Sequence, residues 1–220
     1  MYVDEHKQKW EDMHQLAQFR LKYPDENVIR FVKGSFPNSE GVRLLDLGCG
    51  AGRHVKFMAE EGYDVTGLDF SQTGLDAAEI LLEQNGLQAD LVQGSVLQLP
   101  FADGSFDGIV CFGVLYYLMP NDIQTAIQEI YRVLKPGARA FIVVRSSRDR
   151  RCGKGELIAY KTYRLNSNLS NEQGMIMNFM DADDIHRVFA DFSLVQVGIV
   201  EHSFASLEDL NSDHLIIVTK

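Results

Sequence analysis

Hydrophobic and polar residues follow a helical pattern over the first forty positions of the chain. Hydrophobic side chains recur there at intervals of three and four residues and lie on one face of a helix. Pro24 and its neighbours interrupt this pattern, and residues 28–32 then predict a second short helix. We therefore predict a helical cap over residues 1–40. The hydrophobic face of its first helix contains Trp10, Met13, Leu16 and Ala17.

From residue 42 onward, short hydrophobic runs alternate with segments of helical period. Such runs, flanked by helical patterns, are typical of strands that are buried on both faces. Five strands joined by helices predict a parallel sheet with helices on both of its faces. The predicted helices are 53–59, 72–84 and 121–134, and the predicted strands are 42–46, 63–68, 89–93, 106–112 and 140–144.

The alternation of strands and helices ends after residue 145. Residues 146–180 have no clear period, although 160–165 is a candidate strand, and 181–190 is a candidate capped helix. Residues 192–200 and 214–219 are predicted strands with no helix between them, which favours an antiparallel pair. We predict one domain over 1–220, with a cap (1–40), a core (41–145), an insertion that covers the substrate (146–180), and a C-terminal helix and strands (181–220).

Composition and charge narrow the classes of protein. Hydrophobic residues make up 45% and charged residues 24% of the 220 residues, as in globular domains. The net charge of −10 disfavours a nucleic-acid partner, because an acidic surface repels phosphates. No run of hydrophobic residues is long enough for a membrane span, and the first residues do not resemble a signal peptide. Three scattered cysteines predict neither disulfides nor a zinc site, and we expect a cytoplasmic protein without a metal.

Residues 44–54 carry the most informative motif. A buried strand leads into Gly48, Gly50 and Gly52, and a helix follows. Ligands of open α/β sheets bind at such turns, where glycines let them approach the backbone. Asp69 ends the next strand and is placed to accept hydrogen bonds from ribose hydroxyls, while Phe70 can lie against an adenine ring. Because the third glycine comes only two residues after the second, the spacing favours an adenosine-containing cofactor other than NAD.

Residues 44–52 resemble motif I of the class I S-adenosylmethionine-dependent methyltransferases. Four further segments resemble the small-molecule branch of this family: 67–71, 94–101, 105–107 and 129–137. The resemblance implies an α/β, Rossmann-like fold, with a seven-stranded, mostly parallel sheet, an antiparallel last strand and helices on both faces. It also implies an enzyme that uses S-adenosyl-L-methionine as its cofactor.

The resemblance also assigns cofactor-binding residues. Residues at the glycine turn would surround the methionine end, an aspartate would hold the ribose, and residues after the second and third strands would surround adenine. Many relatives have an aspartate where this chain has Ser95. A serine hydroxyl is a weaker hydrogen-bond acceptor than a carboxylate. The assigned residues are Asp46, Gly48, Cys49, Gly50, Asp69, Phe70, Ser95, Val96 and Phe112.

Candidates for contact with the methyl acceptor follow the fourth and fifth strands. Tyr116 and Tyr117 stand where relatives often carry a histidine, so a histidine base is not expected there. Arg145 ends the fifth strand, and Lys154 lies in the insertion, which carries six basic against three acidic residues. Packing of the tyrosines and solvation of the lysine are the alternatives. His54 has a structural or solvent-facing role, and no catalytic residue is assigned.

The sequence thus predicts transfer of a methyl group to a small molecule by in-line displacement. Two alternatives remain open at this point. One is methylation of a macromolecule such as tRNA or a protein, which the acidic composition disfavours. The other is a protein that binds S-adenosylmethionine without turning it over, since no general base is identified. The oligomeric state is left open.

Overall fold

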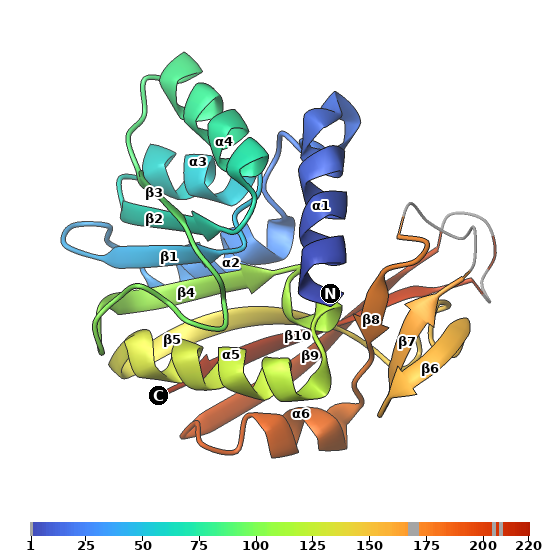
Figure 1. Ribbon diagram of the computed structural model, residues 1–220. Coiled ribbons are helices and arrows are strands. Elements are labelled where there is room, and N and C mark those ends of the chain that lie inside the picture. Colours follow the sequence, from blue (N-terminus) through green and yellow to red (C-terminus); the bar gives the residue numbers. More distant parts are fainter. Residues whose placement is uncertain (1, 167–171, 204–205, 207–208) are drawn as a thin grey trace. The chain divides into compact units, whose positions relative to one another are not determined.

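The computed structural model describes residues 2–166, 172–203, 206 and 209–220. It contains a seven-stranded sheet of order β3-β2-β1-β4-β5-β10-β9, with helices around it (Figure 1). The predicted Rossmann-like fold is therefore confirmed, including the antiparallel end of the sheet. The strands of this sheet are β1 (Arg43–Leu47), β2 (Asp64–Asp69), β3 (Asp90–Gln93), β4 (Phe106–Phe112), β5 (Leu134–Arg145), β9 (Leu194–His202) and β10 (Asn211–Thr219).

The chain divides into two compact units, and the first contains Met1–Val110 and Arg132–Arg139. Its strands β1, β2 and β3 pair in parallel, with Leu45 opposite Thr66 and Gly67 opposite Leu91. Parallel neighbours need a crossover between them, and helices supply it here. The helices of this unit are α1 (Tyr2–Gln15), the 3-10 helix η1 (Ala17–Phe19), α2 (Glu26–Ser35), α3 (Arg53–Glu60) and α4 (Gln72–Gln84).

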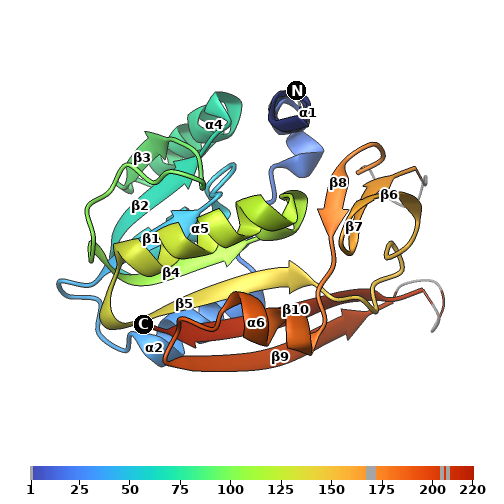
Figure 2. The ribbon, with the colours of Figure 1, turned by 60° about the horizontal axis from the view of Figure 1, so that its bottom comes forward.

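The prediction that Leu16 and Ala17 extend the hydrophobic face of the first helix is wrong. α1 ends at Gln15, so Leu16 lies beyond it and is 52% exposed. Trp10 and Met13 are only half-buried, whereas the polar His14 is buried. The reason is tertiary: α1 packs beside α4 through polar contacts (Figures 1 and 2), and an analysis of hydrophobic residues alone does not detect such contacts.

The second unit contains Cys111–Tyr131 and Ala140–Lys220. β9 and β10 form an antiparallel pair, with Gly198 opposite Leu215, which confirms the predicted hairpin-like end. The predicted capped helix is also confirmed, since the side chains of Asp181 and Asp184 form a capping box at its start. The helices of this unit are the 3-10 helix η2 (Leu115–Tyr117), α5 (Pro120–Val133) and α6 (Ala182–Val188).

Two features of the second half differ from the prediction. β5 begins at Leu134, directly after α5, rather than at residue 140. The segment 146–180, which has no evident period, contains a second, antiparallel sheet of order β6-β7-β8. Strands of three to five residues are too short to show alternation in the sequence. They are β6 (Gly155–Ala159), β7 (Thr162–Leu165) and β8 (Ile176–Asn178).

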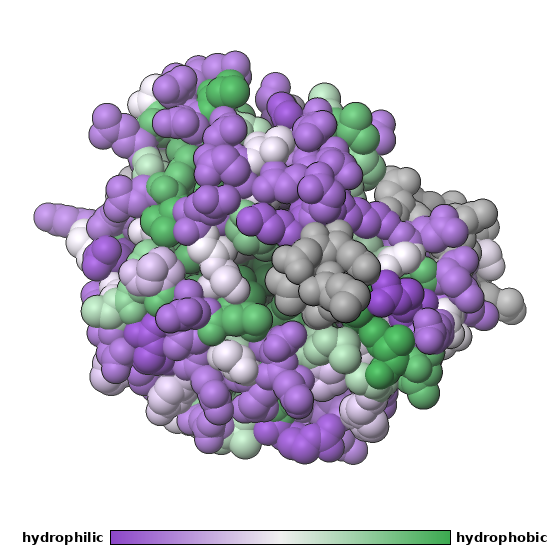
Figure 3. All heavy atoms as spheres, in the orientation of Figure 1, coloured by the Kyte–Doolittle hydropathy of each residue, from purple (hydrophilic) through white to green (hydrophobic). Residues whose placement is uncertain are grey.

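The face seen in Figure 3 is mainly polar. Figure 3 shows a face on which hydrophilic residues dominate and hydrophobic residues occur in small groups. None of the helices that the structure describes is long and hydrophobic enough to cross a membrane. Within the same residues, no group of three His, Cys, Asp or Glu side chains is arranged to hold a metal ion.

Candidate cofactor-binding site

The glycine-rich turn connects β1 to α3 in the first unit. Gly48, Gly50 and Gly52 all have positive φ angles, of 79°, 50° and 82°, which glycine adopts without strain. The backbone N–H groups of Gly48 and Cys49 both donate to the Leu68 carbonyl oxygen, at 2.7 and 3.0 Å. These bonds fasten the turn to the carboxyl end of β2. The turn is therefore held against β2 before any ligand binds.

Gly52 has a packing role. A Cβ atom added there would lie 2.7 Å from Cβ of Ala78 on α4, much closer than van der Waals contact allows. Only glycine therefore lets the start of α3 approach α4 this closely. The third glycine of the motif serves helix packing, whereas Gly48 and Gly50 shape the turn itself.

Asp69, the last residue of β2, joins two loops. Its Oδ2 accepts a hydrogen bond from the Gly50 N–H and its Oδ1 accepts one from the Ser71 N–H, both at 2.8 Å. Burial raises the pKa of this carboxyl, although the two backbone bonds act in the opposite direction. Each carboxylate oxygen can accept a further bond. Asp69 thus shapes the glycine turn and keeps acceptor capacity for a ligand.

Asp46 is a second buried acid at the turn, and it is only 1% exposed. Its Oδ1 lies 3.8 Å from Nδ1 of His54. Its Oδ2 has no hydrogen-bond partner among the residues that the structure describes. A buried carboxylate oxygen without a donor is costly, so this atom marks a place where a ligand can donate. His54 is buried and accepts the Asp25 N–H at 3.3 Å, which agrees with a structural role.

The N-terminal helix contributes two residues that sequence reasoning missed. Glu11 accepts hydrogen bonds from the Ser71 hydroxyl and from the N–H groups of Gln72 and Thr73, at 2.9 to 3.1 Å. It thereby caps the start of α4, as an acid does favourably at a helix N-terminus. His14, three residues later, places Nδ1 3.0 Å from the Ser71 hydroxyl oxygen. Their i, i+3 spacing was the signal available in the sequence.

The residues assigned to adenine lie after β2 and β3. Phe70 is half-buried, Val96 is buried and Ser95 is exposed. The Ser95 hydroxyl accepts the Leu97 N–H at 3.2 Å, so it stabilises the turn after β3. Burial raises the pKa of the Cys49 thiol well above its usual value, so this residue stays protonated in the turn.

Phe112 and the acceptor candidates belong to the second unit. Phe112 is the half-buried last residue of β4. Tyr117 is buried and donates its hydroxyl hydrogen to Oε1 of Glu172, at 2.6 Å. The other oxygen of Glu172 accepts from Arg151, which also forms a two-bond pair with Asp149. Glu172 was missed by sequence reasoning because it lies 55 residues from its tyrosine partner.

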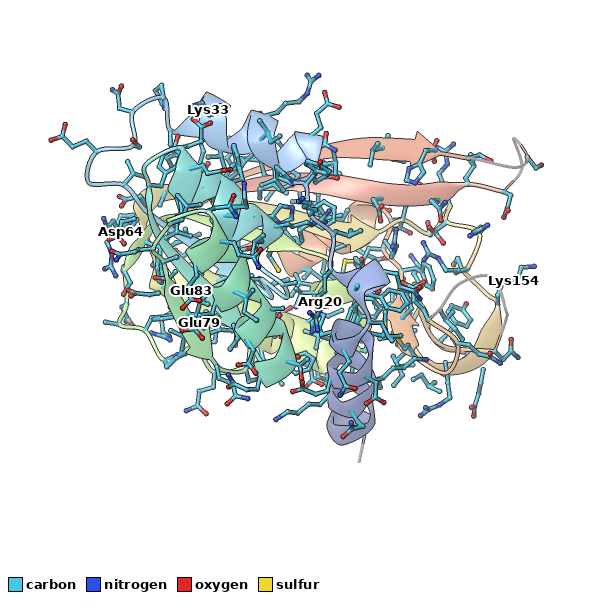
Figure 4. The ribbon with its side chains drawn as sticks, turned by 90° about the horizontal axis from the view of Figure 1, so that it is seen from above. Arg20, Lys33, Asp64, Glu79, Glu83 and Lys154 are labelled. Atoms are coloured by element: carbon cyan, nitrogen blue, oxygen red, sulfur yellow. The ribbon has the colours of Figure 1, made fainter. Side chains whose placement is uncertain are left out.

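Arg145 and Tyr116 form the neighbouring part of the same cluster. The guanidinium of Arg145 donates to both carboxylate oxygens of Asp213, at 2.7 and 2.9 Å, and lies 4.7 Å from the centre of the Tyr116 ring. Burial raises the pKa of both tyrosines, so they are protonated at neutral pH. Lys154 does not join this cluster: its exposed side chain points away from the ribbon in Figure 4.

Comparison with known proteins identifies the core of this fold. Residues 45–142 match the family model described as a methyltransferase domain. Residues 45–142, slightly under half of the chain, thus resemble a methyltransferase domain. This match agrees with the resemblance found in the sequence, and it covers the glycine turn, β2 and β4.

Individual relatives show the same likeness. The chain is 40% identical over 99 residues to an uncharacterised methyltransferase of Synechocystis, covering 45% of each chain. It is 34% identical to an O-methyltransferase of Aspergillus sclerotiorum, covering 60% of this chain and 50% of that one. The chain thus spans about half the length of the curated relatives it matches. A SAM-dependent methyltransferase structure from Methanosarcina mazei has the same fold, with a TM-score of 0.72 and 23% identity, covering 86% of this chain and 96% of that one.

The glycine turn and the two acids beside it have features that fit a ligand such as S-adenosylmethionine. The unpaired oxygen of Asp46 and the remaining capacity of Asp69 are acceptors for the ammonium and hydroxyl donors of such a molecule. Both acids are buried, so their negative charge favours a positively charged ligand over a phosphate. These two buried acceptors thus fit a sulfonium cofactor better than a dinucleotide.

Proposed function

We propose that this protein transfers the methyl group of S-adenosyl-L-methionine to a small-molecule acceptor. The observation that carries the proposal is the glycine turn between β1 and α3, with one buried carboxylate on each side of it. Asp46 precedes the turn and Asp69 faces it from β2. This arrangement combines acceptors for a cationic adenosyl ligand with a backbone that it can approach closely.

The proposed roles of the cofactor residues follow from their positions. Asp46 accepts a hydrogen bond from a donor at the methionine end of the cofactor. The backbone of Gly48, Cys49 and Gly50 contacts the same end. Asp69 accepts hydrogen bonds from the ribose hydroxyls. The remaining proposed contacts, around adenine and the reacting end, are Phe70, Ser95, Val96 and Phe112.

The bound cofactor supplies a methyl group that is already activated by the positive charge on sulfur. The protein's task is therefore chiefly to align the acceptor with that group, and alignment alone can lower a barrier by about 7–11 kcal/mol at best. The rigid attachment of the turn to β2 through the Leu68 carbonyl favours such alignment. A base is required only where the acceptor loses a proton during attack.

The acceptor site is proposed at the end of β4, in the second unit. Tyr116, Tyr117 and Arg145 are its candidates, held by Asp213 and Glu172. Lys154 remains a candidate only for an outer contact with an anionic acceptor. The O-methyltransferase of Aspergillus sclerotiorum among the relatives supports hydroxyl compounds as the first acceptors to test.

Calorimetry tests the cofactor part of the proposal. S-adenosylmethionine, S-adenosylhomocysteine and NAD are titrated into the wild type, Asp69→Ala and the control Asp64→Ala. Asp64 begins the same strand and its side chain is 57% exposed, so it controls for loss of an acid from β2. Loss of hydrogen bonds to a charged acceptor costs about 1.5–3 kcal/mol, so we expect at least tenfold weaker binding in Asp69→Ala alone. Binding of NAD only, or of no ligand, would refute the proposal.

Turnover separates an enzyme from a protein that only binds the cofactor. The protein is incubated with S-adenosylmethionine and either the small-molecule or the macromolecular fraction of a cell extract, and S-adenosylhomocysteine is measured. Its formation with the first fraction alone supports the proposal. Formation with the second fraction alone indicates a macromolecular acceptor, and formation with neither favours a binding protein.

A further inference from the structure

His14 on the N-terminal helix lies against the glycine turn, although no role has been assigned to it. α1 runs beside α4 (Figures 1 and 2), and the imidazole of His14 is only 6% exposed. A Cβ atom added to Gly50 would lie 3.2 Å from Nε2 of His14, and one added to Gly74 would lie 2.8 Å from Nδ1. Glycine at both positions thus makes room for this ring next to the proposed cofactor site.

The hydrogen bonds of Ser71 determine which ring nitrogen of His14 carries the proton. A serine hydroxyl has one hydrogen to donate and two lone pairs that accept. The Ser71 hydroxyl donates to the carboxylate of Glu11, which has no hydrogen of its own to give, and accepts the Gly74 N–H at 3.0 Å. Its remaining lone pair faces Nδ1 of His14. Nδ1 must therefore be the protonated nitrogen, donating to Ser71.

The neighbours of His14 determine its charge. Burial lowers the pKa of the imidazole, and Arg20, whose side chain folds back onto α1 (Figure 4), lowers it further. Asp69 at the end of β2 and Glu11 on α1 act in the opposite direction, and the pKa remains below the usual value for histidine. The ring is thus neutral at neutral pH, which leaves Nε2 as an unprotonated acceptor.

Nε2 is placed to serve a ligand. It lies at the Gly50 side of the ring, and no described residue forms a hydrogen bond with it. Gly50 is the residue whose N–H is held by Asp69, so the free nitrogen adjoins the acid proposed to bind ribose. Unlike Oδ2 of Asp46, this nitrogen is not among the fully buried side-chain atoms that lack a partner, so a donor from outside the chain can reach it.

We propose that Nε2 of His14 accepts a hydrogen bond from an O–H or N–H donor of the bound adenosyl cofactor, so that α1 forms part of the cofactor site. This inference rests on the proposed function. Such a cofactor carries donors on its ribose hydroxyls, its α-ammonium group and its adenine amino group, and the first two belong to the parts proposed to lie at Asp69 and at the glycine turn. Glu11 acts as a positioning residue, because it orients Ser71, and Ser71 orients the imidazole.

The first experiment compares two replacements for His14 in binding S-adenosylhomocysteine by calorimetry at neutral pH. In His14→Asn the side-chain amide can still donate to Ser71 in place of Nδ1, but the acceptor at Nε2 is lost. Gln8→Ala, an exposed change on the same helix, is the control. One lost hydrogen bond predicts roughly tenfold weaker binding for His14→Asn. Wild-type affinity in a stably folded His14→Asn variant would overturn the inference.

The donor group is identified with a truncated ligand. 5′-Methylthioadenosine keeps the ribose but lacks the amino-acid part of the cofactor. If His14→Asn weakens the binding of both ligands equally, the donor is a ribose hydroxyl. If it weakens only S-adenosylhomocysteine binding, the donor is the α-ammonium group. Both results support the inference.

A measurement on the unaltered protein covers the case in which the variant does not fold. Nitrogen-15 NMR of the histidine rings distinguishes a protonated from an unprotonated nitrogen. We expect His14 to be protonated at Nδ1 only, and its Nε2 resonance to shift when S-adenosylhomocysteine is added. No shift despite saturation would refute the inference. Failure of the wild type to bind the ligand at all would instead refute the proposed function.

Discussion

Replacement of Gly52 by alanine tests the packing role of the third glycine. Two costs add. A non-glycine residue at a φ of 82° costs roughly 1–2 kcal/mol. The new Cβ would also stand 2.7 Å from Cβ and 3.1 Å from Cα of Ala78, and such overpacking costs about 1–3 kcal/mol. We therefore expect Gly52→Ala to lower the free energy of unfolding by about 2–5 kcal/mol.

Gly86 provides a matched control for the first of these costs. It also has a positive φ, of 66°, but no atom lies within 4 Å of the Cβ position. Gly86→Ala should therefore lower the free energy of unfolding only by the roughly 1–2 kcal/mol that the backbone strain costs. Urea unfolding followed by far-UV circular dichroism measures both variants. Equal destabilisation by the two substitutions would refute the contact with Ala78.

A double-mutant cycle isolates the contact itself. Ala78→Gly removes the opposing methyl group, at a cost of about 1 kcal/mol for glycine within α4. In that background Gly52→Ala should cost up to about 1–3 kcal/mol less than in the wild type, because the 2.7 Å contact with Cβ is removed and only the 3.1 Å contact with Cα remains. A coupling energy of zero would show that α3 and α4 yield to the extra methyl group, contrary to our reasoning.

Three further predictions concern the second unit. A hydrogen bond and ion pair from Lys161 lower the pKa of Asp181 to about 2. Ionised Asp181 therefore stabilises the folded protein at pH values above the ordinary pKa of an aspartate. This contribution is lost as the pH falls toward about 2. NMR titration should show the pKa of Asp181 rising in Lys161→Met, and an unchanged pKa would contradict this account. Tyr117→Phe removes a donor from the buried carboxylate of Glu172 and should lower the unfolding free energy by about 1–3 kcal/mol, measured in urea; a neutral effect would count against the cluster. A thiol reagent should modify the half-buried Cys152 first and reach the two buried cysteines only on unfolding, whereas simultaneous reaction of all three would disagree with the structure.

The sheet and its helices could be predicted because their buried positions appear as a regular pattern of hydrophobic residues within each segment. The helix predicted over 72–84 and the strand over 106–112 have the observed bounds, since hydrophobic residues on one face or in a run define both. The glycine turn could be predicted for a similar reason, because its residues are contiguous. The short strands β6 and β8 could not, since pairing between segments stabilises them, whereas β7 lies within the predicted strand 160–165.

The polar side chains around the site were the least predictable. His14 is buried by contact with Gly50 and Gly74, which come from elsewhere in the sequence. The pairing of Tyr117 with Glu172 likewise depends on segments 55 residues apart. Hydrophobic periodicity contains no information about such contacts, and the charge of a residue does not reveal which partner satisfies it. The only local sign of these contacts is the i, i+3 spacing of the polar residues Glu11 and His14 on the N-terminal helix.

The position of Trp10 has a practical consequence. It is the only tryptophan in the chain, and its indole lies on α1 with its ring centre 5.7 Å from that of His14. Because a protonated imidazole quenches an adjacent indole more strongly than a neutral one does, the fluorescence of the protein responds to the charge of this histidine. The fluorescence also changes when the two rings move apart. The light emitted by the unlabelled protein is thus a local signal from the N-terminal helix, readable in dilute solution.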